Sequence, residues 1–157
     1  MRSGVGGLAV IIYEWVHKVK HKQISKTEQH LPRHKYHLPI LLAAPFIFIL
    51  LLIFVDINPI YSAVIAMLVG GIFTWYCRPD LKKKMVTSAL LFLGIYFLYF
   101  LTLEIAFPGY VQEVWNFSSI SGVLILKVPL EELMFAFSLG FLWSSVYEHL
   151  AWRKINY

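Results

Sequence analysis

Two adjacent glutamates, Glu131 and Glu132, are the residues of this chain whose type and position most clearly allow chemistry. They follow Pro129 and open a long, aromatic-rich apolar stretch. An ionisable side chain is costly in membrane hydrocarbon, so a carboxyl placed there is a candidate functional group. Apolar surroundings and a neighbouring like charge would favour the protonated form, which could serve as an intramembrane acid or base. The alternative is structural, because acidic residues stabilise the first turn of a helix.

Glu104 is a third candidate acid. It lies three residues before the end of another apolar stretch, and it would share the membrane depth of Glu131 if both stretches cross a bilayer. The two could share a pocket, or Glu104 could reach the headgroups. Adjacent helix positions differ by about 100°, so we expect only one of Glu131 and Glu132 to point into a bundle. Glu148 follows Glu132 by about 16 residues, near the opposite membrane face, where it is expected to anchor the helix end with Tyr147 and Arg153.

The histidines raise the question of a metal site. Pro32 interrupts any continuous helix among them, the basic neighbours repel cations, and Glu28 is the accompanying carboxylate. We therefore predict a solvated loop that faces lipid headgroups, and no metal site. Five histidines have ligand-like spacings of four or three residues: His17 and His21, His30 and His34, and then His37.

The composition is unlike that of a soluble enzyme. Of 157 residues, 59% are apolar and 15% are charged, against about 25% charged in soluble proteins. The net charge of +5 lies mostly in short blocks between apolar runs, which fits anionic lipid headgroups better than nucleic acid. Cys77 is the one cysteine, and we interpret it as a small core or interface residue. No nucleotide-binding loop or hydrolase triad is visible, and no cofactor is identified.

Four apolar stretches are long enough to cross a bilayer, which takes about 20 residues. A fifth, at residues 3–16, is too short to cross alone. The predicted fold class is therefore all-α: a polytopic transmembrane helical bundle of four full spans plus a short N-terminal apolar helix. The four spans are expected at residues 38–55, 59–77, 85–107 and 129–152.

The distribution of cations predicts the orientation of these spans. Lysines and arginines precede the first span, lie between the second and third, and follow the fourth, whereas residues 56–58 and 108–121 contain none. Positively charged loops are retained on the cytoplasmic side. We therefore predict a multi-pass integral membrane protein whose basic loops and C-terminus are cytoplasmic.

The sequence also contains a candidate internal repeat. With this repeat, the chain is predicted to have three parts. Residues 1–16 would be the end of a truncated upstream repeat unit, residues 17–37 a basic cytoplasmic loop, and residues 38–157 the main transmembrane domain. The counterpart of residues 129–132 would then belong to a missing upstream segment or to a separate polypeptide. The matching pairs are Tyr13 and Tyr147, Gly6 and Gly140, Leu8 and Leu142, Glu14 and Glu148, and Lys20 and Lys154.

Short motifs around the spans carry a family resemblance. They are Pro129-Leu130-Glu131-Glu132, the preceding Trp115-Asn116 and Ser121-Gly122-Val123, and the earlier Asn58-Pro59-Ile60-Tyr61 and Arg78-Pro79-Asp80-Leu81. Together they resemble the lycopene cyclase domain of heterodimeric and fused carotenoid cyclases, over most of residues 38–154. Those cyclases are built from two related multi-helix halves, as the candidate repeat suggests.

The resemblance implies redox-neutral closure of a linear carotenoid end group. An acid protonates a terminal double bond, the carbocation cyclises, and a base removes a proton. Glu131 or Glu132 would be the acid or the stabiliser of the cation, with Glu104 as the third catalytic candidate. The aromatic rings of Phe135, Trp143 and Trp115 would bind the substrate.

Only one Pro-x-Glu-Glu motif is present, so a complete site is expected to need another membrane chain. The expected partners are therefore the lipid bilayer, that second chain and a carotenoid. One alternative is a non-catalytic structural or pigment-associated subunit of a larger membrane complex. A glutamate-dependent intramembrane protease is less favoured, because no arginine follows the glutamate pair on the same helix turn.

Overall fold

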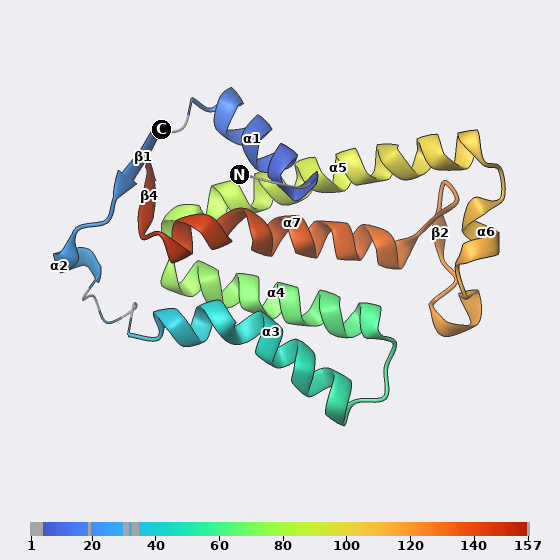
Figure 1. Cartoon of the computed structure of the whole chain (residues 1–157), viewed down its shortest axis with the longest axis horizontal. Helices are drawn as coiled ribbons and strands as arrows, with labels where there is room; N and C mark the ends of the chain where they lie inside the picture. The colour runs from blue at the N-terminus through green and yellow to red at the C-terminus, as the bar shows by residue number, and fades with distance from the viewer. Residues whose placement is uncertain (1–4, 19, 30–31, 33–34, 157) are drawn as a thin grey trace.

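The computed structural model describes residues 5–18, 20–29, 32 and 35–156 (Figure 1). The chain is mostly helical, as predicted, but it also forms four short strands and is therefore not purely all-α. The α-helices are α1 (Val5–Val16), α2 (Lys26–Gln29), α3 (His37–Phe54), α4 (Pro59–Cys77), α5 (Lys82–Ala106), α6 (Tyr110–Val114) and α7 (Leu130–Leu150). The strands are β1 (Lys20–Gln23), β2 (Leu124–Ile125), β3 (Val128–Pro129) and β4 (Arg153–Asn156), and 3-10 turns cover Pro79–Leu81 and Phe117–Ser119.

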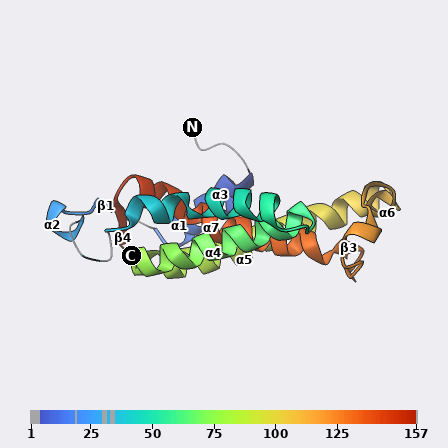
Figure 2. The same ribbon diagram turned by 90° about the horizontal axis from the view of Figure 1, so that it is seen from below.

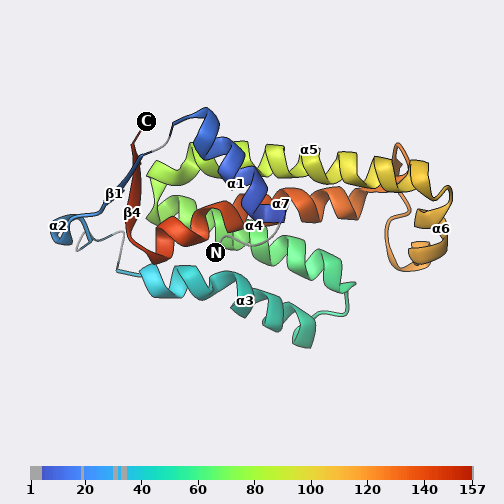
Figure 3. The same cartoon turned by 45° about the horizontal axis from the view of Figure 1, so that its top comes forward.

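Helix α7 lies in the middle of the bundle, between α4 and α5 (Figures 1 and 3). Helix α3 packs along α4, and α1 contacts both α5 and α7. The bundle is much shallower than it is long (Figure 2). Small residues allow close approach between helices, as is usual in membranes. A Cβ atom added to Gly140 of α7, for example, would lie 3.0 Å from the Cα atom of Ala89 on α5.

Among the residues that the structure describes, three helical segments are long and apolar enough to cross a membrane: His37–Phe54, Pro59–Cys77 and Pro79–Ala106. Helix α7, the predicted fourth span, is not among them. It has 21 residues, but its buried face carries Ser144, Glu148 and His149. A central helix faces protein rather than lipid, so it can carry these polar groups at less cost. Three of the four predicted spans are thus candidate membrane helices by length and composition, and the fourth stays a prediction.

Local chemistry explains where the helices of the site begin. Helix α4 starts at Pro59, and the preceding Asn58 accepts a hydrogen bond from the Ile60 N–H at 3.0 Å. Proline suits the first turn of a helix because that position has no intrahelical N–H bond to lose. Helix α7 starts directly after Pro129. Pro59 is the first residue of α4, as predicted, whereas Pro129 ends β3 and precedes the first residue of α7.

The basic blocks gather at one end of the bundle. Strands β1 and β4 pair there in antiparallel fashion, with Lys20 opposite Asn156, beside the start of α5 (Figure 1). Residues 20–23 of the predicted basic loop are therefore an ordered strand. His30 and His34 lie outside the described residues. The opposite end consists of residues 107–129, with α6 and the β2–β3 hairpin. Which end faces the cytoplasm stays a prediction.

Candidate functional site

Glu131 joins three parts of the structure at the start of α7. Its Oε1 atom accepts a hydrogen bond from the Tyr61 hydroxyl of α4 at 2.6 Å and another from the Ser121 backbone N–H at 2.8 Å. The Ser121 N–H also lies 3.1 Å from the Tyr61 oxygen. The residue is only 2% exposed. These bonds fix the carboxylate between α4, α7 and the loop that precedes β2.

Glu132 contacts α5, on the side of α7 opposite to α4. Its Oε2 atom accepts a hydrogen bond from the Tyr96 hydroxyl of α5 at 2.6 Å, and the residue is 7% exposed. The expectation that only one of Glu131 and Glu132 points into the bundle is therefore wrong. Helix α7 packs against α4 on one side and α5 on the other, so both carboxylates are buried, each against a different tyrosine.

An aromatic cavity of about 390 Å³ opens beside Glu132. Electron-rich ring faces attract positive charge, so this wall could stabilise a cation formed next to the carboxyl group. A second cavity, of about 350 Å³, is bordered by both Glu131 and Glu132 together with Trp115, Asn58 and Asn116. The aromatic residues of the first cavity are Tyr96, Tyr99, Phe100, Tyr110, Trp115 and Phe135.

Glu104 is also buried, at 6% exposed, but it contacts a turn rather than the other carboxylates. It accepts hydrogen bonds from the backbone N–H groups of Gly109 at 3.0 Å and Val111 at 3.5 Å, and Lys127 Nζ lies 3.5 Å away. Gly109 has φ of 89°, a left-handed conformation that suits glycine. Glu104 is not among the described residues that line either cavity. It holds the turn between α5 and α6, which supplies part of the aromatic wall.

The predicted substrate-binding aromatics separate into two groups. Phe135 and Trp115 line the aromatic cavity, whereas Trp143 is 56% exposed and lies further along α7, outside its lining. Tyr96 could not be singled out from the sequence, because it is one of many aromatic residues in an apolar helix. Tyr61 could have been found, since it belongs to the Asn58-Pro59-Ile60-Tyr61 motif.

The far end of α7 holds a buried charge cluster. Lys84 was expected in a basic block facing headgroups, but it is fully buried. Its Nζ atom lies 2.7 Å from Glu148 Oε1 and 3.0 Å from Glu14 Oε1. Glu148 therefore pairs with Lys84 rather than with Arg153, whose guanidinium lies over the Tyr147 ring at 5.2 Å. Glu14 and Glu148, which the candidate repeat aligns, meet at one ammonium group.

The sequence model of the lycopene cyclase family matches residues 58–150, more than half of the chain. The matched region includes Glu131 and Glu132 as well as their partners Tyr61 and Tyr96. Neither a curated protein nor a solved structure matches the chain.

Proposed function

The chain belongs to the lycopene cyclase family, and we propose that it takes part in the acid- and base-catalysed cyclisation of a linear carotenoid end group. One observation carries this proposal: the buried carboxyl group of Glu132 binds a tyrosine and borders an aromatic cavity of about 390 Å³. Family membership supports the class of substrate. The cavity supports the class of reaction, because it joins an acid to a wall that favours positive charge.

In this proposal the protonated Glu132 is the acid. It gives its proton to a terminal carbon–carbon double bond, whose π electrons form the new C–H bond and leave a carbocation. A second double bond of the polyene attacks the cation and closes the ring. A base then takes a proton from a carbon beside the new cation, and that C–H pair becomes the product double bond. The product is an isomer of the substrate, so no oxidant or reductant is consumed.

The positions of the two glutamates suggest different roles. The Tyr96 hydroxyl fixes Oε2 of Glu132, which leaves Oε1 as the atom that transfers the proton. Glu131 is fixed by Tyr61 and by the backbone of Ser121, so its carboxylate cannot turn freely towards a substrate. We assign it the stabilisation of positive charge from the second cavity. Glu104 is assigned a positioning role, because it holds the turn that carries part of the aromatic wall.

An apolar groove offers a place for the rest of the polyene. It has a volume of about 570 Å³ and runs between α4, α5 and α7. Its described lining holds no charged side chain and includes Leu68, Leu93, Phe97, Leu133 and Phe137. A carotenoid chain is a hydrocarbon, so such a groove can bury it without removing any polar group from water. The substrate would then enter from the bilayer.

We further propose that the active unit includes a second membrane chain. The sequence holds one Pro-x-Glu-Glu motif, whereas the cyclases that it resembles are built from two related multi-helix halves. The basic end of the bundle would face the cytoplasm and the aromatic cavity would lie near the outer face. A second chain could then supply the base that completes the reaction.

The test is pigment analysis in lycopene-accumulating cells. The chain is expressed together with any adjacently encoded membrane chain that carries a Pro-x-Glu-Glu motif, and carotenoids are separated by chromatography. We expect cyclised product from the wild-type pair and a loss of roughly 100-fold or more in Glu132→Gln, the typical size of general acid catalysis. Glu113→Gln, on an exposed glutamate of α6, is the matched control and should keep the product. A folded Glu132→Gln variant with unchanged cyclisation would overturn the assignment.

The same experiment addresses a second candidate function, a non-catalytic subunit that holds pigment. The apolar groove favours this reading, because it can bind a polyene without any acid. In that case the wild-type pair would leave lycopene unchanged while lycopene co-purifies with the folded chain. Substitution of Leu93 by Trp would then release the pigment, whereas Glu132→Gln would not.

A further inference from the structure

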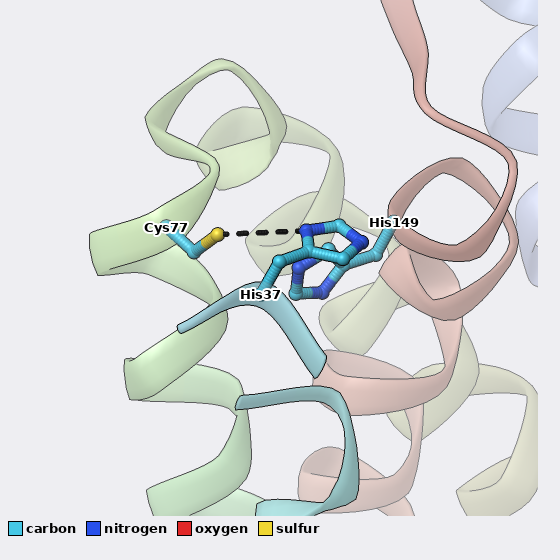
Figure 4. A group of neighbouring side chains, drawn as sticks. All are labelled: His37, Cys77 and His149. Atoms are coloured by element: carbon cyan, nitrogen blue, oxygen red, sulfur yellow. Dashed lines mark hydrogen bonds between the residues drawn. The ribbon is translucent and has the colours of Figure 1, made fainter. Parts of the chain in front are cut away.

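Three potential metal ligands meet at the end of the bundle opposite the paired glutamates. His37 begins α3, Cys77 ends α4 and His149 lies in the last turn of α7, so each comes from a different helix (Figure 4). One ligand atom from each lies within 4.8 Å of the other two. Cys77 and His149 are at most 1% exposed, whereas His37 is partly exposed.

We propose that His37, Cys77 and His149 form a binding site for a Zn²⁺ ion. Bonds of about 2.3 Å to sulfur and about 2.0–2.1 Å to nitrogen place two ligands of a tetrahedral zinc about 3.6 Å apart. Cys77 Sγ and His37 Nδ1 are 3.8 Å apart, so they need to move by only a few tenths of an ångström. A thiolate with two imidazoles suits zinc, whereas Mg²⁺ and Ca²⁺ require oxygen ligands. Water would fill the fourth position.

The surroundings are compatible with a bound cation. Arg78 follows Cys77 directly, but its guanidinium binds Asp80 at 2.8 and 3.0 Å and the backbone oxygens of Glu148 and Arg153. The carboxylate compensates its charge. On the other side, the Trp152 ring stacks on His37 with centroids 3.8 Å apart and an interplanar angle of 15°. Such stacking orients the imidazole.

The cluster that contains Lys84 is a poorer site, although Glu14, His21 and Glu148 also come close enough to hold a metal ion. There the Lys84 ammonium already lies between the two carboxylates, at 3.0 and 2.7 Å. A divalent cation would have to displace a buried, paired lysine. His21 therefore serves as a control position for the zinc proposal.

Zinc at this site would join the start of α3 to the rest of the bundle. Helix α3 packs mainly on α4 through its small residues, and it buries only Ala43 and Ala44, so a metal ion would add a covalent link from α3 to α7. As the Zn–S bond forms, the Sγ proton passes to solvent and the sulfur supplies the electron pair. Acid should therefore weaken binding, because it restores the thiol.

The experiment uses the whole chain in detergent micelles, stripped with a chelator and titrated with Co²⁺ as a coloured substitute for Zn²⁺. Cys77 is the one cysteine, so a thiolate-to-cobalt charge-transfer band reports this site alone. We expect one Co²⁺ per chain and loss of the band on addition of Zn²⁺. Cys77→Ser should abolish the band. His149→Gln should weaken Co²⁺ binding by more than roughly 10–100-fold, which is the loss typical for a residue that only supports a metal ligand. His17→Gln and His21→Gln should bind as the wild type does.

A second measurement uses only the wild-type chain, so a misfolded variant cannot explain its result. Zn²⁺ should slow the alkylation of Cys77 in the wild-type chain, and Mg²⁺ should not. If the folded wild type shows neither a charge-transfer band nor protection by Zn²⁺, the proposal is wrong and the contact is a plain S–H···N hydrogen bond. Loss of the band in a folded His21→Gln variant would also overturn it, because His21 would then be a ligand in place of the proposed set. Neither readout depends on cyclase activity.

Discussion

Replacing Lys84 with methionine should strongly destabilise the bundle. The Lys84 side chain is fully buried, and its ammonium is shared by Glu148 at 2.7 Å and Glu14 at 3.0 Å. Methionine has a similar length but no charge, so the variant leaves Glu148, which is 1% exposed, buried without its counter-ion. Breaking a buried ion pair from one side costs about 3–5 kcal/mol. That is a large share of the roughly 5–15 kcal/mol by which folded proteins are stable.

The partner of the lysine can be removed at the same time. In Lys84→Met/Glu148→Gln neither buried charge remains, so we expect much of the lost stability to return. The coupling between the two sites should reach about 2–3 kcal/mol, near the upper end for residues in direct contact. Glu14→Gln should have a smaller effect than Lys84→Met, because Glu14 is 14% exposed and water can replace part of the interaction.

The assay is reversible unfolding in mixed detergent micelles, followed by tryptophan fluorescence and circular dichroism. Lys82→Met is the matched control two residues away. Lys82 is exposed, and its ammonium lies 5.5 Å from the Trp75 ring, a contact that contributes about 0.5–1 kcal/mol. If Lys84→Met unfolds within about 1 kcal/mol of the wild type, the lysine reaches water and the charge cluster is not the buried structure described.

Three further substitutions test the packing and the site. Gly140→Ala places a Cβ atom 3.0 Å from the Cα atom of Ala89 and should lower the free energy of unfolding by about 1–3 kcal/mol in the same assay. The control is Gly94→Ala, whose added Cβ atom meets nothing within 4 Å and should not destabilise the bundle. Equal effects of the two substitutions would contradict the close contact between α5 and α7. Glu104→Ala should lower the melting temperature in micelles and accelerate proteolysis after residue 107, and an unchanged cleavage pattern would argue against its role in the turn. Tyr96→Phe should slow cyclisation by roughly 10–100-fold, because its hydroxyl stabilises the carboxylate that Glu132 becomes as it gives up its proton, and a hydrogen bond to a charged group contributes about 1.5–3 kcal/mol. Unaltered pigment yields would remove this tyrosine from the mechanism.

The candidate site was predictable only in part. Glu131 and Glu132 could be named because charged residues beside Pro129 interrupt an apolar run, and the family motif includes them. Their tyrosine partners lie 70 and 36 residues away in the chain. Both tyrosines are on helices whose sequences show little difference in polarity from one face to another. The family was correctly identified, whereas the internal repeat, the membrane orientation and the need for a partner chain stay predictions.

The sequence by itself determined the long helices and, to within about three residues, their ends. Long apolar runs can satisfy their backbone hydrogen bonds in lipid only as helices, and prolines mark where two of them begin. Only the tertiary structure decided how each helix is rotated about its axis. That rotation buries Lys84 and brings His37, Cys77 and His149 together. The physical reason is that lipid is as apolar as a protein core. A membrane helix therefore carries little difference in polarity between the face that meets lipid and the face that meets its neighbours.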